Sequence, residues 1–144
     1  EIILYGRRLN DSMGPYVAQE TIKMMIKKGI SVNNSNILVL GITFKEDCPD
    51  IRNTRAIDII EELKSYSANV CVFDPWASIE EVKHEYGIEI KTNKDNLKSN
   101  YDAVILAVSH KEFKELDIHN YVNGNYVIFD VKSILDKESI DSRL

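Results

Sequence analysis

The residues of this sequence with the clearest capacity for chemistry are three cations, Lys45, Arg52 and Arg55, in one polar segment. The segment follows a buried strand pattern at 36–40 and leads into an amphipathic helix pattern at 55–66. A loop between the carboxyl end of a strand and the start of a helix presents backbone N–H groups and the positive end of the helix dipole. Together with the cations, this arrangement predicts a binding site for a phosphorylated ligand.

The same cations have a simpler interpretation, as ion-pair partners of the acidic residues beside them. Glu46, Asp47 and Asp50 lie in the same segment as Lys45 and Arg52, and exposed ion pairs are common and weak. A charge-assisted hydrogen bond to a diphosphate would instead contribute about 1.5–3 kcal/mol. Spacing alone gives the two interpretations equal weight.

The segment LGITFKEDCPDIRNTR, residues 40–55, resembles the signature that opens the C-terminal domain of the UDP-glucose/GDP-mannose dehydrogenase family. The similarity is greatest to its bacterial UDP-N-acetylhexosamine 6-dehydrogenases. Other segments resemble the family's landmarks in the same order: GRRLNDSMGPYVA at 6–18, which matches the end of the central helical domain, FDP at 73–75, AVSHKEFKEL at 107–116 and FDVKSIL at 129–135. The resemblance spans the whole chain.

This resemblance implies an NAD-dependent enzyme that oxidises the C6 alcohol of a UDP-hexose or UDP-N-acetylhexosamine to a carboxylate, for the synthesis of bacterial surface polysaccharides. It implies that Phe44, Lys45 and Lys132 contact the UDP-sugar and that Arg52 reaches NAD. NAD itself would be bound mainly by an N-terminal domain, and the catalytic cysteine would lie upstream of this chain. The chain is therefore expected to hold no catalytic residue and to be inactive alone.

Other reactive side chains have ordinary structural interpretations. Asp74-Pro75 is a common turn, which we favour over a ligand contact. His110 has no visible partner in the sequence and ranks low as a catalytic base. Cys48 is a poor nucleophile because its acidic neighbours disfavour the thiolate. Lys132 could also be an ordinary surface lysine, and as a point charge it lacks the fork of the arginine found in some branches of the family.

The elements that must position these residues alternate between strands and helices. Apolar runs predict four main strands, at 37–40, 70–73, 103–108 and 126–129. Helical spacing predicts helices at 55–66 and 78–86. A shorter strand at 88–90 and a helical turn at 93–97 are predicted between the second and third main strands. The pattern predicts an α/β fold with a doubly wound, Rossmann-like parallel sheet covered on both faces. Of the G-x-G-x-x-G fingerprint only Gly41 is present, so this sheet is not expected to hold NAD in the dinucleotide-fold manner.

Upstream of the first strand, apolar residues at helical spacing predict a helix that ends near Gly29. Pro15 indicates either a new helix capped at residues 10–12 or a longer helix that bends there, and we favour the bent helix. Residues 1–35 are expected to be the end of the central helical domain and a linker, and residues 36–144 the UDP-sugar-binding domain. The resemblance implies a homodimer formed through the central helix and an N-terminal domain as a partner. Arg7, Arg8 and Asn10 on this helix would serve either the active site or the dimer.

Composition limits the remaining function classes. The formal net charge of -5 argues against a nucleic-acid surface. No apolar run approaches the roughly 20 residues of a membrane span, and no signal peptide is visible, so a cytoplasmic protein is expected. The two cysteines have neither disulfide nor zinc spacing, and no metal is expected. The chain begins at Glu1 rather than Met and looks cut from a longer one.

Two rival functions remain. A phosphoacceptor receiver domain would use Asp74, Ser109 and Lys132, each of which follows a predicted strand. Such a domain needs an acidic pair for Mg²⁺ after the first strand, where this chain has Leu40 and Gly41. A purely structural oligomerisation domain would leave the loop cations solvated.

Overall fold

The computed structural model describes residues 2–143, with side chains described for 13–138 and 140–143. One five-stranded sheet has the strand order β2-β1-β3-β4-β5, and all its paired strands are parallel. The strands are β1 (Asn36–Leu40), β2 (Asn69–Phe73), β3 (Tyr101–Leu106), β4 (Val122–Asp130) and β5 (Ser142–Arg143).

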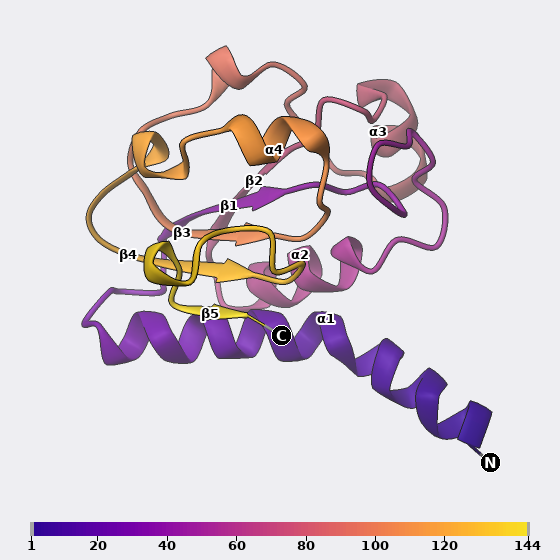
Figure 1. Ribbon diagram of the computed structural model, residues 1–144, viewed down its shortest axis with the longest axis horizontal. Helices are drawn as coiled ribbons and strands as arrows, with labels where there is room; N and C mark the ends of the chain where they lie inside the picture. Colours follow the sequence, from indigo (N-terminus) through magenta and orange to yellow (C-terminus); the bar gives the residue numbers. More distant parts are fainter. Residues whose placement is uncertain (1, 144) are drawn as a thin grey trace.

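Helices cover both faces of this sheet. They are α1 (Ile2–Lys27), α2 (Ala56–Ser65), α3 (Ile79–Tyr86) and α4 (Lys111–Glu115), with 3₁₀ turns η1 (Lys94–Asn96), η2 (Ile118–Tyr121) and η3 (Lys137–Ser139). Figure 1 shows α1 and α2 below the sheet and α4 above it. The predicted doubly wound parallel sheet is therefore confirmed.

The strand side chains alternate between two buried cores, as the two-residue repeat of a strand requires. On β1, Ile37 and Val39 pack with the α1 and α2 side chains, whereas Leu38 and Leu40 pack with Phe113 of α4 on the opposite face. Because both faces are buried, both sets of positions are apolar. This explains the continuous apolar runs in the sequence.

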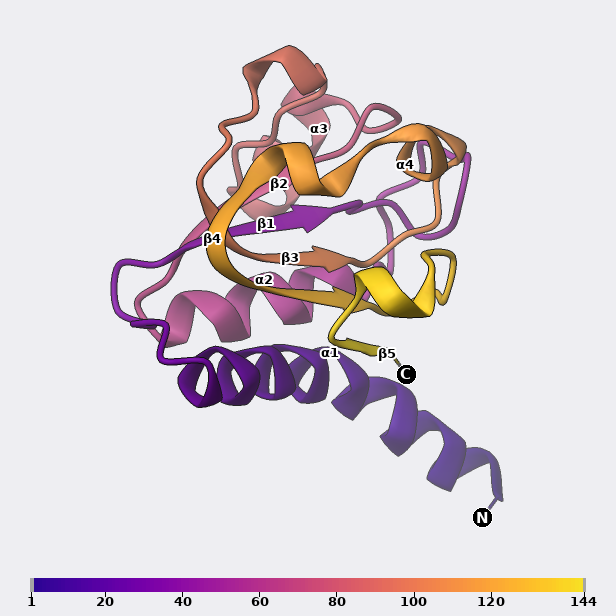
Figure 2. The ribbon, with the colours of Figure 1, turned by 60° about the vertical axis from the view of Figure 1, so that its left-hand side comes forward.

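Helix α1 runs continuously through Pro15. Figures 1 and 2 show that it changes direction part-way along and that its N-terminal part extends beyond the rest of the molecule. A proline lacks the N–H that would close the helical turn, which accounts for the bend. Further along the helix, Val17, Ile22 and Met25 are buried in the core shared with α2.

The side chains of Arg7, Arg8 and Asn10 lie outside the described residues. The division of the chain at residue 35 stays a prediction. Of the helices in the part of the chain that is described, none is both long enough and apolar enough to cross a membrane.

Three boundaries differ from the sequence-based expectation. Residues 88–90 form no strand. Ile88 and Ile90 are apolar because they are buried against the core, and the only bridge to the sheet in this described segment is made by the next residue, Lys91, with Phe73. Strand β3 ends at Leu106, since the next two N–H groups both bond to the Leu40 carbonyl and leave the ladder. Strand β4 begins at Val122 rather than at residue 126, and β5, α4, η2 and η3 were not predicted.

Candidate functional site

A cavity of about 300 Å³ lies at the carboxyl edge of the sheet, beyond the ends of β1 and β3. The strand order reverses at this place, because the chain passes from β1 to β2 on one side and then continues with β3 on the other. Ligands of doubly wound sheets bind at such a switch point. The cavity is lined by loops after three strands, the start of α2 and one α1 residue: Thr43, Phe44, Asn53, Thr54, Arg55, Ala56, Ile59, Ala107, Val108, Val131, Lys132 and Met13.

Two of the residues predicted to contact a ligand meet in this cavity. Phe44, from the loop after β1, and Lys132, from the loop after β4, both line it, and both side chains are exposed. Neither Lys45 nor Arg52 is among the described residues that line it. Lys45 is exposed in the loop beside Phe44, and its backbone carbonyl accepts a hydrogen bond from Thr43 Oγ1 at 3.0 Å.

Arg52 forms the ion pair that the simpler interpretation predicted. Its Nε and Nη2 donate to the two carboxylate oxygens of Asp50, each at 3.0 Å, and its backbone N–H also donates to Asp50. The side-chain hydrogen bond from Arg52, followed by the backbone one, lowers the pKa of Asp50 to about 2. Tyr86 of α3 anchors this part of the loop by donating from its hydroxyl to the Ile51 carbonyl at 2.6 Å.

The turn after β1 is built on Gly41 and Asp74. Gly41 has φ +100° and packs against Val108, so a side chain there would be strained and would overlap that residue. The next two N–H groups, of Ile42 and Thr43, both donate to Oδ2 of Asp74, at 2.7 and 3.2 Å. In a dinucleotide fold, the backbone at this turn faces the pyrophosphate. These N–H groups have an internal acceptor instead, so the turn does not fit NAD.

Asp130 plays the corresponding part at the end of β4. Its buried carboxylate accepts from the N–H groups of Lys132 at 3.0 Å and Leu135 at 2.8 Å. These bonds fold the loop back at the strand end and bring Lys132 to the cavity. A Phe-Asp pair thus stands at the end of two strands, since Asp74 directly follows β2 and Asp130 is the last residue of β4. Each aspartate organises the loop that follows.

The predicted turn at Asp74 is confirmed. Oδ1 of Asp74 accepts from the N–H groups of Trp76 at 2.8 Å and Ala77 at 3.2 Å. The residue has no exposed surface, and its carboxylate also accepts the two bonds from the loop after β1. A carboxylate surrounded in this way is not accessible to a phosphoryl donor, which argues against the receiver-domain alternative.

His110 is the residue that sequence reasoning undervalued. It is fully buried, and its ring nitrogens lie within hydrogen-bond distance of Asp74, Thr43 and Asp47. Its partners come from two other loops at the same edge of the sheet. The available signal was the position of His110 and Asp74 just after two strands, because the carboxyl ends of parallel strands meet at one edge.

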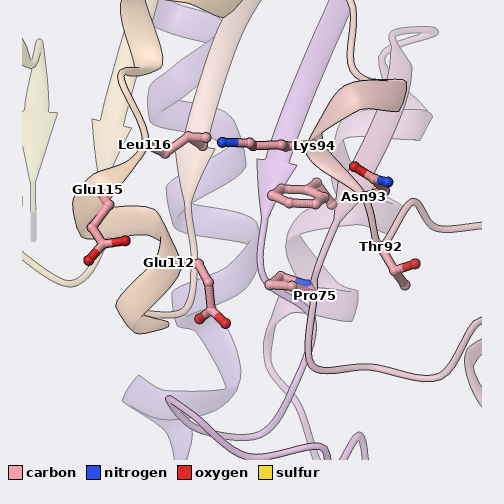
Figure 3. A pocket seen from close by; sticks show the side chains of 8 residues that line it. Pro75, Thr92, Asn93, Lys94, Glu112, Glu115 and Leu116 are labelled. Carbon is pink, nitrogen blue, oxygen red and sulfur yellow. The ribbon is translucent and has the colours of Figure 1, made fainter.

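A larger cavity, of about 530 Å³, lies on the α4 side of the sheet. Figure 3 shows Glu112 and Glu115 of α4 on one side of it and Lys94 on the other. Two carboxylates against one ammonium repel a diphosphate more than they attract it. Cys48 and Cys71 are free thiols, and the described residues include no group of His, Cys, Asp and Glu that could hold a metal ion.

Comparison with known proteins gives a consistent result. The family described as "UDP-glucose/GDP-mannose dehydrogenase family, UDP binding domain" matches residues 38–137. UDP-N-acetyl-D-glucosamine 6-dehydrogenase of Salmonella typhi is 52% identical over 100% of this chain and 34% of its own length. Protein CapL of Staphylococcus aureus is 43% identical over 98% of this chain and 33% of its own. The chain therefore spans about a third of the length of these relatives.

Solved structures have the same fold. An NDP-N-acetyl-D-galactosaminuronic acid dehydrogenase from Methanosarcina mazei Go1 superposes with a TM-score of 0.84 at 24% identity, over 96% of this chain and 29% of its own. The UDP-N-acetyl-mannosamine dehydrogenase Cap5O from S. aureus superposes with a TM-score of 0.72 at 29% identity, over 96% of this chain and 31% of its own. The family match over most of the chain, together with a parallel sheet whose cavity lies at the switch point, shows that this chain belongs to the UDP-glucose/GDP-mannose dehydrogenase family, of which it is the UDP binding domain.

Proposed function

We propose that this chain is the C-terminal nucleotide-sugar-binding domain of an NAD-dependent dehydrogenase, which oxidises the C6 alcohol of a UDP-hexosamine to a carboxylate. Whole-chain similarity to UDP-N-acetyl-D-glucosamine 6-dehydrogenases of two bacteria supports the substrate class. The observation that carries the proposal is that Phe44 and Lys132, from separate loops, line one cavity at the switch point of the sheet.

The cavity suits part of a UDP-sugar. The Lys132 ammonium and the N-terminus of α2 attract the diphosphate, and the exposed Phe44 ring offers an apolar face to the base or sugar. Lys45, which follows Phe44, adds a second cation in the same loop. A cavity of about 300 Å³ is at the small end of ligand sites, so a second domain would have to enclose the rest of the substrate.

Arg52 is proposed to reach the NAD held by that second domain. Bound NAD would accept the hydride from the sugar, which requires the sugar carbon and the nicotinamide to be held together. The side chain of Arg52 is 81% exposed and already bonded to Asp50. Contact with a cofactor phosphate would therefore mean sharing the guanidinium or exchanging Asp50 for the phosphate.

The wider setting follows from the same proposal. Residues 1–35 would be the end of a central helical domain, and the projecting part of α1 would join an N-terminal domain and a second copy in a homodimer. The enzyme would be cytoplasmic, and this chain alone would be inactive because the NAD domain and the catalytic cysteine would belong to another part of the enzyme.

Titration of the 144-residue chain with UDP, monitored through the NMR signals of the backbone amides, tests the binding role. We expect shifts at residues 43–44, 107–108 and 131–132, and an affinity about tenfold weaker in Lys132→Ala, as the loss of one charge-assisted contact predicts. Lys45→Ala should weaken binding less, because Lys45 is not among the described residues that line the cavity. The matched control is Lys23→Ala, an exposed lysine on α1. Shifts confined to the larger cavity, or equal affinity in Lys132→Ala, would refute the assignment.

A further inference from the structure

The loop 42–47, which carries Phe44 and Lys45, is held at both ends by buried polar groups. At its start, Oδ2 of Asp74 accepts from the Ile42 and Thr43 N–H groups, at 2.7 and 3.2 Å. At its end, the Asp47 N–H donates to Nδ1 of His110 at 2.9 Å. Phe44 and Lys45 thus lie between two fixed points.

His110 links these two points. Its Nε2 lies 3.0 Å from Oδ2 of Asp74 and 3.1 Å from Oγ1 of Thr43. Because Nδ1 accepts from the Asp47 N–H, the ring hydrogen belongs on Nε2, from which it is donated to Asp74. One imidazole therefore connects the carboxylate at the start of the loop with the backbone at its end.

The packing around His110 fixes its ring orientation. The ring is fully buried and contacts two aromatic rings. The Trp76 ring is stacked on it, with the ring centroids 6.0 Å apart and an angle of 25° between the planes, and the Phe113 centroid lies 5.3 Å away. His110 is the N-cap residue directly before α4, and the next N–H, of Lys111, donates to Oδ1 of Asp47 at 2.9 Å. The start of α4 thus holds Asp47 by its backbone and by its side chain.

We propose that His110 is a positioning residue for nucleotide binding, which holds the loop 42–47 in the conformation that places Phe44 at the cavity. The inference rests on the proposed function, because the ligand is the diphosphate handle of that substrate. His110 has no exposed surface and so acts through the loop. A loop that is already ordered loses little entropy when the ligand binds, whereas a released loop must be ordered at that moment.

Two near-isosteric variants separate positioning from simple packing. His110→Asn places an amide oxygen close to the position of Nδ1, so this variant keeps an acceptor for the Asp47 N–H. His110→Gln places an amide nitrogen near the position of Nε2, so it keeps the donor to Asp74 but leaves the Asp47 N–H without its acceptor. We expect His110→Asn to bind UDP within about twofold of the unsubstituted chain and His110→Gln to bind several-fold more weakly. His119→Gln, which replaces an exposed histidine paired with Asp117, is the control.

A second substitution, at Asp47, lies outside the core. Asp47 is exposed and has φ +52°, a conformation that glycine adopts freely, so Asp47→Gly removes the carboxylate that holds Lys111 without threatening the fold. Combined with His110→Gln, it releases both links from α4. The double variant should bind UDP roughly tenfold more weakly than the unsubstituted chain. Its amides at 43–47 should also exchange hydrogen faster, while the β1 and β3 amides stay protected.

The outcomes separate this inference from the proposed function. If the unsubstituted chain shows no UDP binding, the proposed function fails. The hydrogen exchange of the ligand-free loop still decides whether His110 holds it. Unchanged exchange at 43–47 in the double variant overturns the positioning role. So does equal UDP affinity in His110→Asn and His110→Gln, because a purely structural histidine would not distinguish the two nitrogens.

Discussion

Replacing Gly41 with alanine is expected to destabilise the fold because two independent effects act at this residue. Its φ of +100° is a conformation that residues with a Cβ adopt only under strain, which costs about 1–2 kcal/mol. A Cβ at this position would also lie 2.5 Å from the Val108 Cβ and 3.0 Å from the Val108 backbone nitrogen. Neither is the end of a flexible side chain, so β3 and the loop after it would have to move.

Relieving this overlap should cost a further 1–3 kcal/mol, roughly, as for other overpacked cores. Gly29 supplies the control, because it also has positive φ, at +77°, yet an added Cβ would meet nothing within 4 Å. Gly29→Ala therefore measures the strain alone. We expect Gly41→Ala to lower the free energy of unfolding by about 2–5 kcal/mol and Gly29→Ala by about 1–2 kcal/mol.

Urea denaturation with linear extrapolation gives both values, provided that the slope m is unchanged. A Val108→Gly background removes the closest contact of the new Cβ but leaves the strain. The cost of Gly41→Ala should therefore fall in this background by about 1 kcal/mol or more, as a double-mutant cycle would show. If Gly41→Ala were no more destabilising than Gly29→Ala, the close approach of Gly41 to Val108, between the segments that follow β1 and β3, would not be the reason for this glycine.

Three further predictions concern the loop and helix contacts. The carboxyl group of Asp50 should titrate near pH 2 when followed by NMR. Because its pKa is lowered from 3.8, the contribution of its pair with Arg52 to folding stability is complete above pH 3.8 and is lost as the pH falls through about 2. Arg52→Gln should return the midpoint toward 3.8, and a midpoint already near 3.8 in the unsubstituted chain would contradict the pair. Tyr86→Phe should cost about 1 kcal/mol in urea denaturation through the lost bond to the Ile51 carbonyl, and no cost would mean that the loop is not anchored there. Gly14→Ala should destabilise by about 1–3 kcal/mol, although alanine favours helices by about 1 kcal/mol, because its Cβ would lie 2.5 Å from the Asp58 Cβ of α2; a more stable variant would refute this packing.

The sheet could be predicted from the sequence because its strands are buried on both faces. Runs such as Ile37–Leu40 in β1 are apolar at every position, and that pattern is independent of which helix covers which face. The strand ends were harder to place. Ile88 and Ile90 are apolar because they pack against the core, and the hydrogen bonds that would make them a strand do not form. Burial can be predicted from apolar residue types, whereas backbone hydrogen bonding at the edge of a sheet has no such signal in the sequence.

The site could be predicted only in part for a similar reason. Phe44 and Lys132 could be assigned to one edge of the sheet, because each follows a strand and parallel strands end together. The same rule indicates that His110 and Asp74 lie at one edge, but it does not indicate which groups the imidazole bonds to. Asp74, Thr43 and Asp47 are brought to it by two other loops, and no local spacing along the chain records such a meeting.

Asp74 and Asp130 also bear on the proposed nucleotide binding, because both aspartates occupy backbone donors at the carboxyl edge of the sheet. In a glycine-rich dinucleotide turn the backbone approaches the pyrophosphate directly, and replacing a single side chain removes little of that contact. Here the N–H groups after β1 are bonded to Asp74 and those after β4 to Asp130, so these donors are already used. Under the proposed function, a ligand at the cavity would then be held largely by Phe44, Lys132 and the start of α2, all of which line it. Asp130→Ala should therefore weaken UDP binding, because it releases the loop that carries Lys132; unchanged affinity would mean that the backbone at this edge binds the ligand itself.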